Sequence, residues 1–277
     1  MAWTSEAIPE YFQEYLGEPD ERVKDWFLLN SPLYLIAIYV VYFLFIVLGL
    51  YFMHNRKPFQ LKGCLVVYNC IQVGFAAYIC EESVSSAILA KHNFICTPLD
   101  PSYNRIMLRI AKTFWLFYVS KIIDLLDTVF LVLRKKDRQL SFLHIYHHSS
   151  MVFNWYLGVL YSPGGQATLS VILNSFVHVI MYTYYLLSAL GVQKYLWWKK
   201  YLTQLQLLQF IIILLHLVFG TINGCQKPIW LVYFTFLYLW SMVFLFLNFY
   251  ATTYDNDRKM YLEAIKREQQ KKIEKRD

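Results

Sequence analysis

The sequence predicts an all-α integral membrane protein with seven transmembrane helices. Two observations predict this class: the chain of 277 residues is 57% hydrophobic with only 16% charged residues, and its apolar residues fall in long runs. A helix needs about 20 mostly apolar residues to cross the hydrocarbon core of a bilayer. Helices are expected rather than strands, because a helix pairs its own backbone polar groups within lipid.

Seven apolar runs reach or approach the length of a membrane-spanning helix. In chain order, the predicted helices cover residues 33–52, 63–80, 113–133, 140–161, 167–190, 202–220 and 228–250. Residues 33–250 are therefore expected to form one membrane domain, preceded by a polar segment at 1–32 and followed by a charged tail at 251–277. No cleavable signal peptide is expected, because residues 1–32 lack the apolar stretch that one requires.

The distribution of lysine and arginine predicts the orientation of the helices. The connectors on one side, together with the tail, contain 18 Lys and Arg residues, whereas the connectors on the other side, together with the N-terminal segment, contain 6. Cytosolic loops of membrane proteins carry the excess of basic residues. We therefore expect a lumenal N-terminus and a cytosolic C-terminus.

The positions of the five cysteines predict one disulfide. Cys96 and Cys225 are the only two in connectors expected to be lumenal, where the compartment is oxidising. A Cys96–Cys225 disulfide is expected, the alternative being two unrelated buried thiols. Cys64, Cys70 and Cys80 belong to the second predicted helix and are expected to be packing residues.

Ionisable side chains in the third predicted helix indicate a functional site, since such groups are costly within lipid. Lys121, Asp124 and Asp127 occur in the string KIIDLLDT, at spacings that place them near one helical face. Lys121 can pair with Asp124 one turn later, which a purely structural ion pair would also explain. Asp127 then needs a partner from another helix.

The next three predicted helices each carry a polar stripe as well. These stripes are formed by His144, His147 and His148 in the string HIYHH, by Asn174, His178, Met181, Tyr182 and Tyr185, and by Thr203, Gln206 and Gln209. One stripe alone could be a helix contact. Four neighbouring stripes predict a shared polar pocket, and counting helical rise places it roughly 5 to 17 Å below the cytosolic surface.

Clustered histidines can bind a metal ion or perform acid–base and nucleophilic chemistry. Membrane desaturases and hydroxylases with a di-iron centre use more histidines than the four near this pocket, since His54, His92 and His216 lie elsewhere in the sequence. A metal-dependent lipid desaturase or hydroxylase with one metal ion therefore stays an alternative. A seven-helix receptor or a transporter would share the helix count, but neither explains HxxHH at the head of a helix.

An ordered set of segments resembles the fatty acid elongases of very long chain fatty acids. The segments are NRKPF, KIIDLLDT, HIYHH, NSFVHVIMYTYY and TQLQLLQF, and the resemblance runs from about residue 30 to residue 254. HxxHH alone is a weak signal, whereas the ordered set is specific. Asp124 departs from the family pattern KxxExxDT, which has Glu there, so the carboxylate is kept but its reach is one methylene shorter.

The resemblance implies that the protein condenses long-chain or very-long-chain acyl-CoA with malonyl-CoA to 3-oxoacyl-CoA, carbon dioxide and CoA, without a cofactor or metal. This is the first step of the microsomal fatty acid elongation cycle. The resemblance also implies that helices two to seven form a closed bundle around an acyl tunnel in the endoplasmic reticulum membrane. It further implies homodimers and association with the 3-ketoacyl-CoA reductase, 3-hydroxyacyl-CoA dehydratase and enoyl-CoA reductase of the cycle. No nucleic-acid partner is expected.

Roles in this reaction can be assigned to the polar residues. We expect the catalytic residues to be Lys121, Asp124, Asp127, His144, His147, His148 and His178. Our hypothesis is that His147 or His148 attacks the acyl thioester, with His178 assisting. The alternative is direct condensation, with histidine only as a general base.

Two further sets of residues are expected to bind the substrates. Asn174, Gln206 and Gln209 are candidate hydrogen-bond donors to an enolate or thioester oxygen, and Tyr182 is expected to line the same site. The basic residues Arg134, Lys135, Lys199 and Lys200 on the expected cytosolic side suit the phosphates of CoA.

Overall fold

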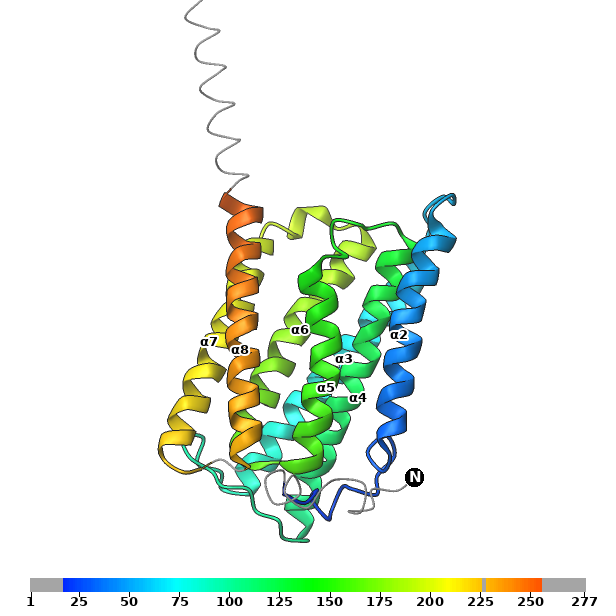
Figure 1. Ribbon diagram of the computed structural model, residues 1–277. Coiled ribbons are helices and arrows are strands. Elements are labelled where there is room, and N and C mark those ends of the chain that lie inside the picture. Colours follow the sequence, from blue (N-terminus) through cyan, green and yellow to red (C-terminus); the bar gives the residue numbers. More distant parts are fainter. Residues whose placement is uncertain (1–16, 226–227, 256–277) are drawn as a thin grey trace, which may run out of the picture.

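The computed structural model describes residues 17–225 and 228–255, and within that part all regular structure is helical (Figure 1). The predicted segment 1–32 and tail 251–277 are thus described only in part, since residues 1–16 and 256–277 lie outside. The long helices are α2 (Pro32–Met53), α3 (Lys62–Leu89), α4 (Arg105–Leu133), α5 (Phe142–Tyr161), α6 (Thr168–Leu190), α7 (Lys199–Ile222) and α8 (Ile229–Tyr250). Short helical turns are η2 (Gly165–Ala167), η3 (Gln193–Tyr195) and η4 (Ala251–Asp255).

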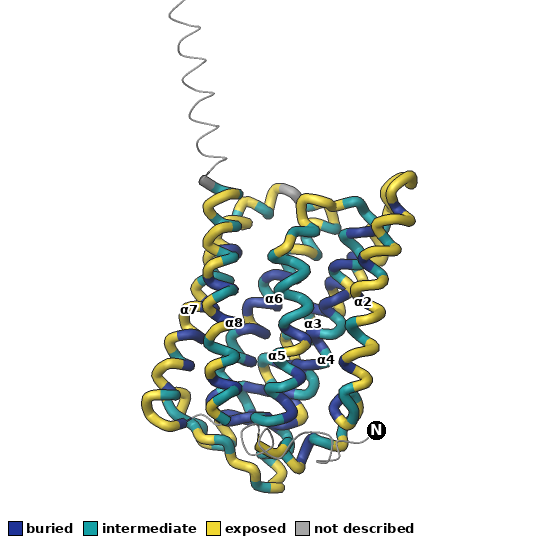
Figure 2. Tube along the Cα trace, viewed as in Figure 1, coloured by how far each residue is buried: buried dark blue, intermediate teal, exposed yellow. Residues whose placement is uncertain are grey.

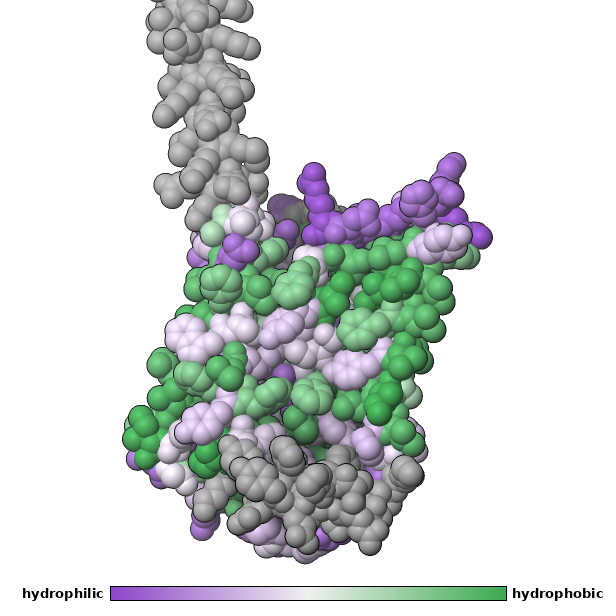
Figure 3. Space-filling model, in the orientation of Figure 1, coloured by the Kyte–Doolittle hydropathy of each residue, from purple (hydrophilic) through white to green (hydrophobic). Residues whose placement is uncertain are grey.

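Most of these helices have the composition of membrane-spanning segments. Among the described residues, five helices are long and apolar enough to cross a membrane: α2, α3, α6, α7 and α8, the last counted together with η4. The helices α4 and α5 do not meet this criterion and carry the ionisable side chains of KIIDLLDT and HIYHH. Hydrophobic side chains dominate the middle of the surface in Figure 3, with hydrophilic ones along its upper edge. The chain is a multi-pass membrane protein.

Two helices extend well beyond their predicted ends. The helix α3 runs to Leu89 instead of Cys80, and α4 begins at Arg105 instead of Thr113. Each extension contains a charged residue that interrupts the apolar run. Glu82 on α3 and Arg109 on α4 form an ion pair with each other. The helices continue through these residues because their charges are paired between neighbouring helices.

The helices α3 to α8 pack in a definite order of neighbours. In that order, α3 contacts α4, α4 contacts α5, α5 contacts α8, α8 contacts α7, α7 contacts α6, and α6 contacts α3. The helix α2 lies outside this set, against α4 and α5. Its exposed surface is visible in Figure 2, and only Leu35, Tyr42, Ile46 and Met53 are buried. The functional side chains discussed below lie within the set α3 to α8.

The connectors gather at two ends of the bundle (Figure 1). We call the end with connectors 54–61, 134–141 and 191–198 the basic end, and the end with connectors 90–104 and 162–167 the disulfide end. At the disulfide end, Cys96 and Cys225 form the expected disulfide, with their Cα atoms 5.5 Å apart. The turn at 162–165 packs closely against the 90–104 connector. Gly165 has φ +57°, and a Cβ at this position would lie 2.9 Å from the Leu99 nitrogen, so only glycine fits there.

The described part of the N-terminal segment is folded against the disulfide end. The Asp20 amide donates to the Leu160 carbonyl at 2.7 Å. Arg22 is buried, pairs with Asp20 at 2.7 Å and donates to the Asp100 carbonyl at 2.8 Å. Val23 is fully buried as well. This polar stretch therefore forms part of the folded structure at that end.

Candidate functional site

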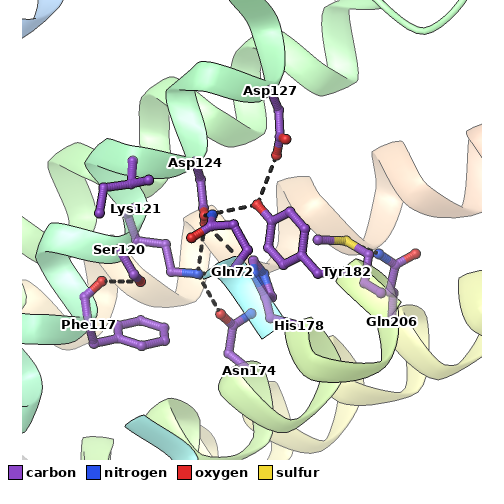
Figure 4. Close-up of polar contacts among 12 residues, drawn as sticks. Gln72, Phe117, Ser120, Lys121, Asp124, Asp127, Asn174, His178, Tyr182 and Gln206 are labelled. Carbon is purple, nitrogen blue, oxygen red and sulfur yellow. Dashed lines mark hydrogen bonds and ion pairs between the residues drawn. The ribbon is translucent and has the colours of Figure 1, made fainter. Parts of the chain in front are cut away.

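A buried polar cluster lies between α3, α4 and α6 (Figure 4). At its centre, Lys121 Nζ lies 3.2 Å from Asp124 Oδ2, 3.0 Å from Asn174 Oδ1 and 3.5 Å from His178 Nε2. All four residues are buried. A buried charge is tolerated only with an opposite charge and hydrogen bonds around it. The cluster supplies both to Lys121, and the predicted Lys121–Asp124 pair is present.

The second oxygen of Asp124 is also fully engaged. It accepts from Gln72 Nε2 at 2.6 Å and from the Tyr182 hydroxyl at 2.9 Å. The same hydroxyl lies 2.8 Å from Asp127 Oδ2, so Tyr182 is the interhelical partner that Asp127 required. Although its side chain is one methylene shorter than the Glu of the family pattern, Asp124 therefore still reaches partners on α3 and α6. Gln72 was missed by the sequence reasoning, although a glutamine inside an apolar helix is a signal of the same kind as the others.

The histidines of HIYHH enter the structure at the start of α5. The Ser141 hydroxyl caps this helix by accepting from the His144 amide at 3.2 Å. His144 Nε2 lies 2.9 Å from Thr128 Oγ1 on α4, which is itself 3.0 Å from the Tyr42 hydroxyl on α2. His144 is therefore held in place by α4, and through Thr128 by α2.

His147 and His148 stand differently from His144. Their ring centroids are 5.3 Å apart, and His148 lies 4.3 Å from His144. Within the described residues, neither ring makes a hydrogen bond, and the His147 ring centroid lies 6.4 Å from those of Phe210 and Phe246. The histidines of α5 thus form a group of their own, which shares helix α4 with the cluster around Lys121 through the contact of His144 with Thr128.

A largely apolar cavity adjoins this site, between α5, α6, α7 and α8. Its apolar lining includes Trp155, Phe210, Ile213, Leu217, Val232 and Leu239. Asn174 lines the same cavity and also contacts Lys121, so it connects the cavity to the polar cluster. Along α5, the lining runs from Met151 to Ser162, which is about 16 Å of helix. The cavity ends among Leu99, Gln166, His216 and Cys225 at the disulfide end.

The stripe expected on the sixth predicted helix does not join the polar cluster. Gln206 Nε2 contacts the sulfur of Met181 at 3.4 Å. Gln209 lines the cavity instead, and the Thr203 hydroxyl lies 3.2 Å from that of Tyr254. On α6, Tyr185 is 41% exposed and lies outside the cluster. Within the described residues, direct contacts therefore join the stripes of α4 and α6, whereas the α5 stripe contacts α4 through Thr128 and the α7 stripe stays outside the cluster.

The four basic residues expected to bind CoA all lie at the basic end. Arg134 follows the last residue of α4, and Lys135 Nζ donates to the His54 carbonyl at 3.0 Å. Lys199 and Lys200 are exposed at the start of α7, where the Lys200 ammonium lies 5.5 Å from the Tyr250 ring centroid. No contact joins the two pairs within the described residues.

A metal ion in a protein is held by several His, Cys, Asp or Glu side chains that meet around one point. In the part of the chain that the structure describes, no three His, Cys, Asp or Glu side chains are grouped so as to hold a metal ion. The three histidines of α5 share one end of a helix, but their rings interact mainly with one another, with Thr128 and with aromatic residues.

Comparison with known proteins gives a consistent family. Residues 27–261 match the family described as "ELO: GNS1/SUR4 family", a range that includes α2 to α8. Very long chain fatty acid elongase 4 of Homo sapiens is 42% identical over 252 residues, covering 90% of this chain and 80% of that protein. Very long chain fatty acid elongase 1 of Homo sapiens is 40% identical over 261 residues, covering 92% and 93%. Very long chain fatty acid elongase 7 of Rattus norvegicus is 40% identical over 256 residues, covering 90% and 91%.

Proposed function

The chain belongs to the GNS1/SUR4 family, and on that premise we propose that it is a fatty acid elongase, a very-long-chain 3-oxoacyl-CoA synthase. It condenses a long-chain or very-long-chain acyl-CoA with malonyl-CoA to 3-oxoacyl-CoA, carbon dioxide and CoA. The observation that carries this proposal is the histidine group of α5, in which His147 and His148 make no hydrogen bond within the described residues and His147 packs against Phe210 of the cavity lining. The comparisons do not favour a metal-dependent desaturase or hydroxylase.

In this proposal, all seven long helices cross the membrane of the endoplasmic reticulum. The ionisable groups of α4 and α5 face the bundle interior, as intramembrane charges do. The basic end is cytosolic and the disulfide end lumenal, which is supported by the excess of Lys and Arg at the former and the Cys96–Cys225 disulfide at the latter. The neighbour order of α3 to α8 supports a closed bundle, with the acyl chain in the cavity.

The first chemical step is acyl transfer to histidine. A nitrogen of His147 or His148 attacks the carbonyl carbon of the acyl thioester, the carbon–sulfur bond breaks, and CoA leaves as a thiolate that takes up a proton. The product is an acyl-imidazole whose chain occupies the cavity. No cysteine could replace the histidine, because Cys64 and Cys70 are exposed on α3 and Cys80 donates to the Ile172 carbonyl outside the site.

The second step forms the new carbon–carbon bond. Malonyl-CoA loses carbon dioxide, which leaves the enolate of acetyl-CoA, and the enolate carbon attacks the acyl carbon. The carbon–nitrogen bond then breaks, and the departing imidazole nitrogen takes up one proton from water, which restores the neutral ring. Asn174 is placed to assist: Lys121 donates to its Oδ1, which fixes the amide so that its Nδ2 is left to donate to a substrate oxygen in the cavity.

The other polar residues act by positioning. Asp124 holds Lys121, and Lys121 in turn holds Asn174 and the ring of His178. Tyr182 ties Asp127 to this network. Gln209 binds substrate from the α7 side of the cavity, and Gln206 binds substrate only if its amide turns away from Met181. Arg134, Lys135, Lys199 and Lys200 attract the phosphates of CoA at the basic end.

The same residues also permit direct condensation, with a histidine acting only as general base. Trapping separates the two mechanisms. Acyl-CoA supplied without malonyl-CoA should release free CoA and leave protein carrying one acyl group, detectable by its mass. A variant with His147→Gln and His148→Gln should release none. Absence of acylated wild-type protein under these conditions would leave only the general-base mechanism.

The function itself is tested by carbon transfer. Purified protein in lipid is mixed with labelled malonyl-CoA and a set of acyl-CoAs, and lipid products two carbons longer are expected to carry label. The double variant with His147→Gln and His148→Gln should abolish labelling. His54→Gln is the matched control, because His54 lies beyond the end of α2 and, among the described residues, its side chain hydrogen-bonds only to Asn55. Absence of labelled product with every acyl-CoA would refute the elongase proposal.

Partners follow from the reaction. Its 3-oxo product must be reduced, dehydrated and reduced again, so we propose association with the 3-ketoacyl-CoA reductase, 3-hydroxyacyl-CoA dehydratase and enoyl-CoA reductase, and assembly as a homodimer. Co-purification of the three enzymes from cross-linked membranes tests the first part. The mass of the protein in a lipid nanodisc tests the second.

A further inference from the structure

Polar groups interrupt the apolar lining of the cavity at mid-depth. Asn154 on α5 and Gln209 on α7 both line it. Neither Asn154 Oδ1 nor Gln209 Oε1 has a hydrogen-bond partner among the described residues, and Gln209 is only 4% exposed. Buried amide oxygens without a partner are rare in folded proteins, because the lost hydration is not replaced. These two atoms therefore call for a partner within the cavity.

The two residues lie at a similar distance from the basic end. Asn154 is twelve residues from the start of α5, and Gln209 is ten residues from the start of α7, which corresponds to about 18 and 15 Å of helix. Asn154 follows His147 by seven residues, so it lies on the same face of α5 two turns deeper, about 10 Å away. Both polar groups thus lie along the path of an acyl chain that begins at His147.

The chemistry of the two amides defines what can satisfy them. Asn154 Nδ2 donates to the Ser150 carbonyl at 2.7 Å, which fixes the orientation of this amide and leaves Oδ1 as an acceptor. A methylene chain offers no donor to it and would displace any water. A hydroxyl group can donate its one proton to Asn154 Oδ1 and accept at the same time from Gln209 Nε2, once the Gln209 amide is turned so that its NH₂ group faces the hydroxyl.

We propose that the cavity accepts acyl-CoA substrates with a hydroxyl group near the middle of the chain, and that Asn154 and Gln209 bind this hydroxyl. The proposal rests on the elongase function. An extended chain advances about 1.2 Å per bond, since a three-bond peptide residue spans at most 3.3–3.6 Å. About 10 Å is therefore about eight bonds, which places the hydroxyl near the ninth or tenth carbon when the carbonyl carbon is at His147.

The test compares three substrates: octadecanoyl-CoA, 10-hydroxyoctadecanoyl-CoA and 10-oxooctadecanoyl-CoA. The 10-oxo chain has an oxygen at the same carbon but cannot donate to Asn154. The expected result for the wild-type protein is a kcat/KM about tenfold higher for the 10-hydroxy than for the 10-oxo substrate, the size of effect of one buried hydrogen bond. This comparison needs no variant.

Variants then locate the effect. Asn154→Leu and Gln209→Met remove the amide oxygens at similar volume, and each should lower the ratio of 10-hydroxy to 10-oxo turnover by several fold. The matched control is Leu217→Met, an apolar change in the lining of the same cavity, which should leave the ratio unchanged. Because each variant is judged by a ratio of two substrates, a partial loss of folded protein does not alter the reading.

Two outcomes overturn the proposal while the elongase function stands. One is elongation of octadecanoyl-CoA with a wild-type ratio near one. The other is a high ratio that both polar variants retain. A clear preference for octadecanoyl-CoA over the 10-hydroxy substrate would mean that the amides hold ordered water, which also overturns it. If no acyl-CoA is elongated, the elongase function fails and the hydroxyl site with it.

Discussion

The Tyr182 hydroxyl lies 2.9 Å from Asp124 Oδ1 and 2.8 Å from Asp127 Oδ2, so one phenol on α6 joins two carboxylates on α4. A phenol has a single proton and can donate to only one carboxylate at a time. Asp124 is also paired with Lys121, so the phenol couples Asp127 to that ion pair. Tyr182 thereby determines the geometry of the site without carrying a charge.

Tyr182→Phe is expected to lower both stability and turnover. The change leaves the buried carboxylate of Asp124 and the half-buried carboxylate of Asp127 without their shared hydroxyl, at a cost of about 1–3 kcal/mol in the free energy of unfolding. Turnover should fall because Lys121 and Asn174 lose their fixed positions. Thermal unfolding in lipid nanodiscs and steady-state elongation measure the two effects.

The control for this variant is Tyr185→Phe on the same helix. Tyr185 is 41% exposed, and its contacts to Tyr182 and Tyr184 are made by the ring, which Phe retains. Its expected change in stability is within about 0.5 kcal/mol. Equal losses in the two variants would show that the bridge between Asp124 and Asp127 has no special role.

The Lys121–Asp124 ion pair is expected to be strongly coupled. Lys121→Met and Asp124→Asn each leave a buried charge without its partner, which costs about 3–5 kcal/mol. The double variant removes both charges and should lose clearly less than the sum of the two single losses. A double-mutant cycle of unfolding free energies measures this coupling.

An exposed ion pair of the same spacing provides the comparison. Lys24 and Glu21 are also three residues apart, at 2.7 Å, but their side chains are 38% and 60% exposed. The cycle of Lys24→Met and Glu21→Gln should give a coupling too small to measure, because water screens an exposed ion pair. Additive losses at Lys121 and Asp124 would contradict a paired charge at the centre of the site.

Sequence patterns predicted the helices better than their ends. Apolar length is a local property, and it located all seven long helices. The helix ends depended on pairing between chain segments: Glu82 lies on α3 and Arg109 on α4, and only their contact explains why both helices continue past charged residues. The burial of Arg22 against Asp100 at the disulfide end has the same origin, since nothing local distinguishes it from an exposed arginine.

The candidate site was predictable where its residues share a helix. Lys121 and Asp124 are one turn apart, so their pairing follows from helical spacing. Gln72 and Thr128 join the site through contacts between helices, at 2.6 Å to Asp124 and 2.9 Å to His144. The number of residues from the helix start placed Gln206 at the same depth in the membrane as these groups. Position along the chain does not fix which neighbour a side chain faces, and the Gln206 amide contacts Met181.

The cysteines give a chemical test of the disulfide and of the loops that it joins. Alkylation of the unfolded, unreduced protein should modify Cys64, Cys70 and Cys80 only. After reduction, Cys96 and Cys225 should be alkylated as well, and the mass of the protein shows how many cysteines have reacted. The bond joins residues 129 positions apart, so chain-entropy reasoning gives a stabilisation of about 4–5 kcal/mol. Cys96→Ser should therefore lower the unfolding temperature, whereas Cys64→Ser, at an exposed position, should not. Five reactive cysteines before reduction would rule the bond out.

The last prediction concerns the basic end. If Lys199 and Lys200 attract the phosphates of CoA, Lys199→Gln with Lys200→Gln should raise the KM for malonyl-CoA several fold with little change in kcat, and the increase should shrink at high salt because exposed charges are screened. Lys194→Gln serves as control, since Lys194 is exposed on the preceding turn. Lys135→Gln should act differently: its ammonium already bonds the His54 carbonyl, so its loss should lower stability as well as affinity. A KM that does not change with salt in the wild-type protein would argue against an electrostatic role for these lysines.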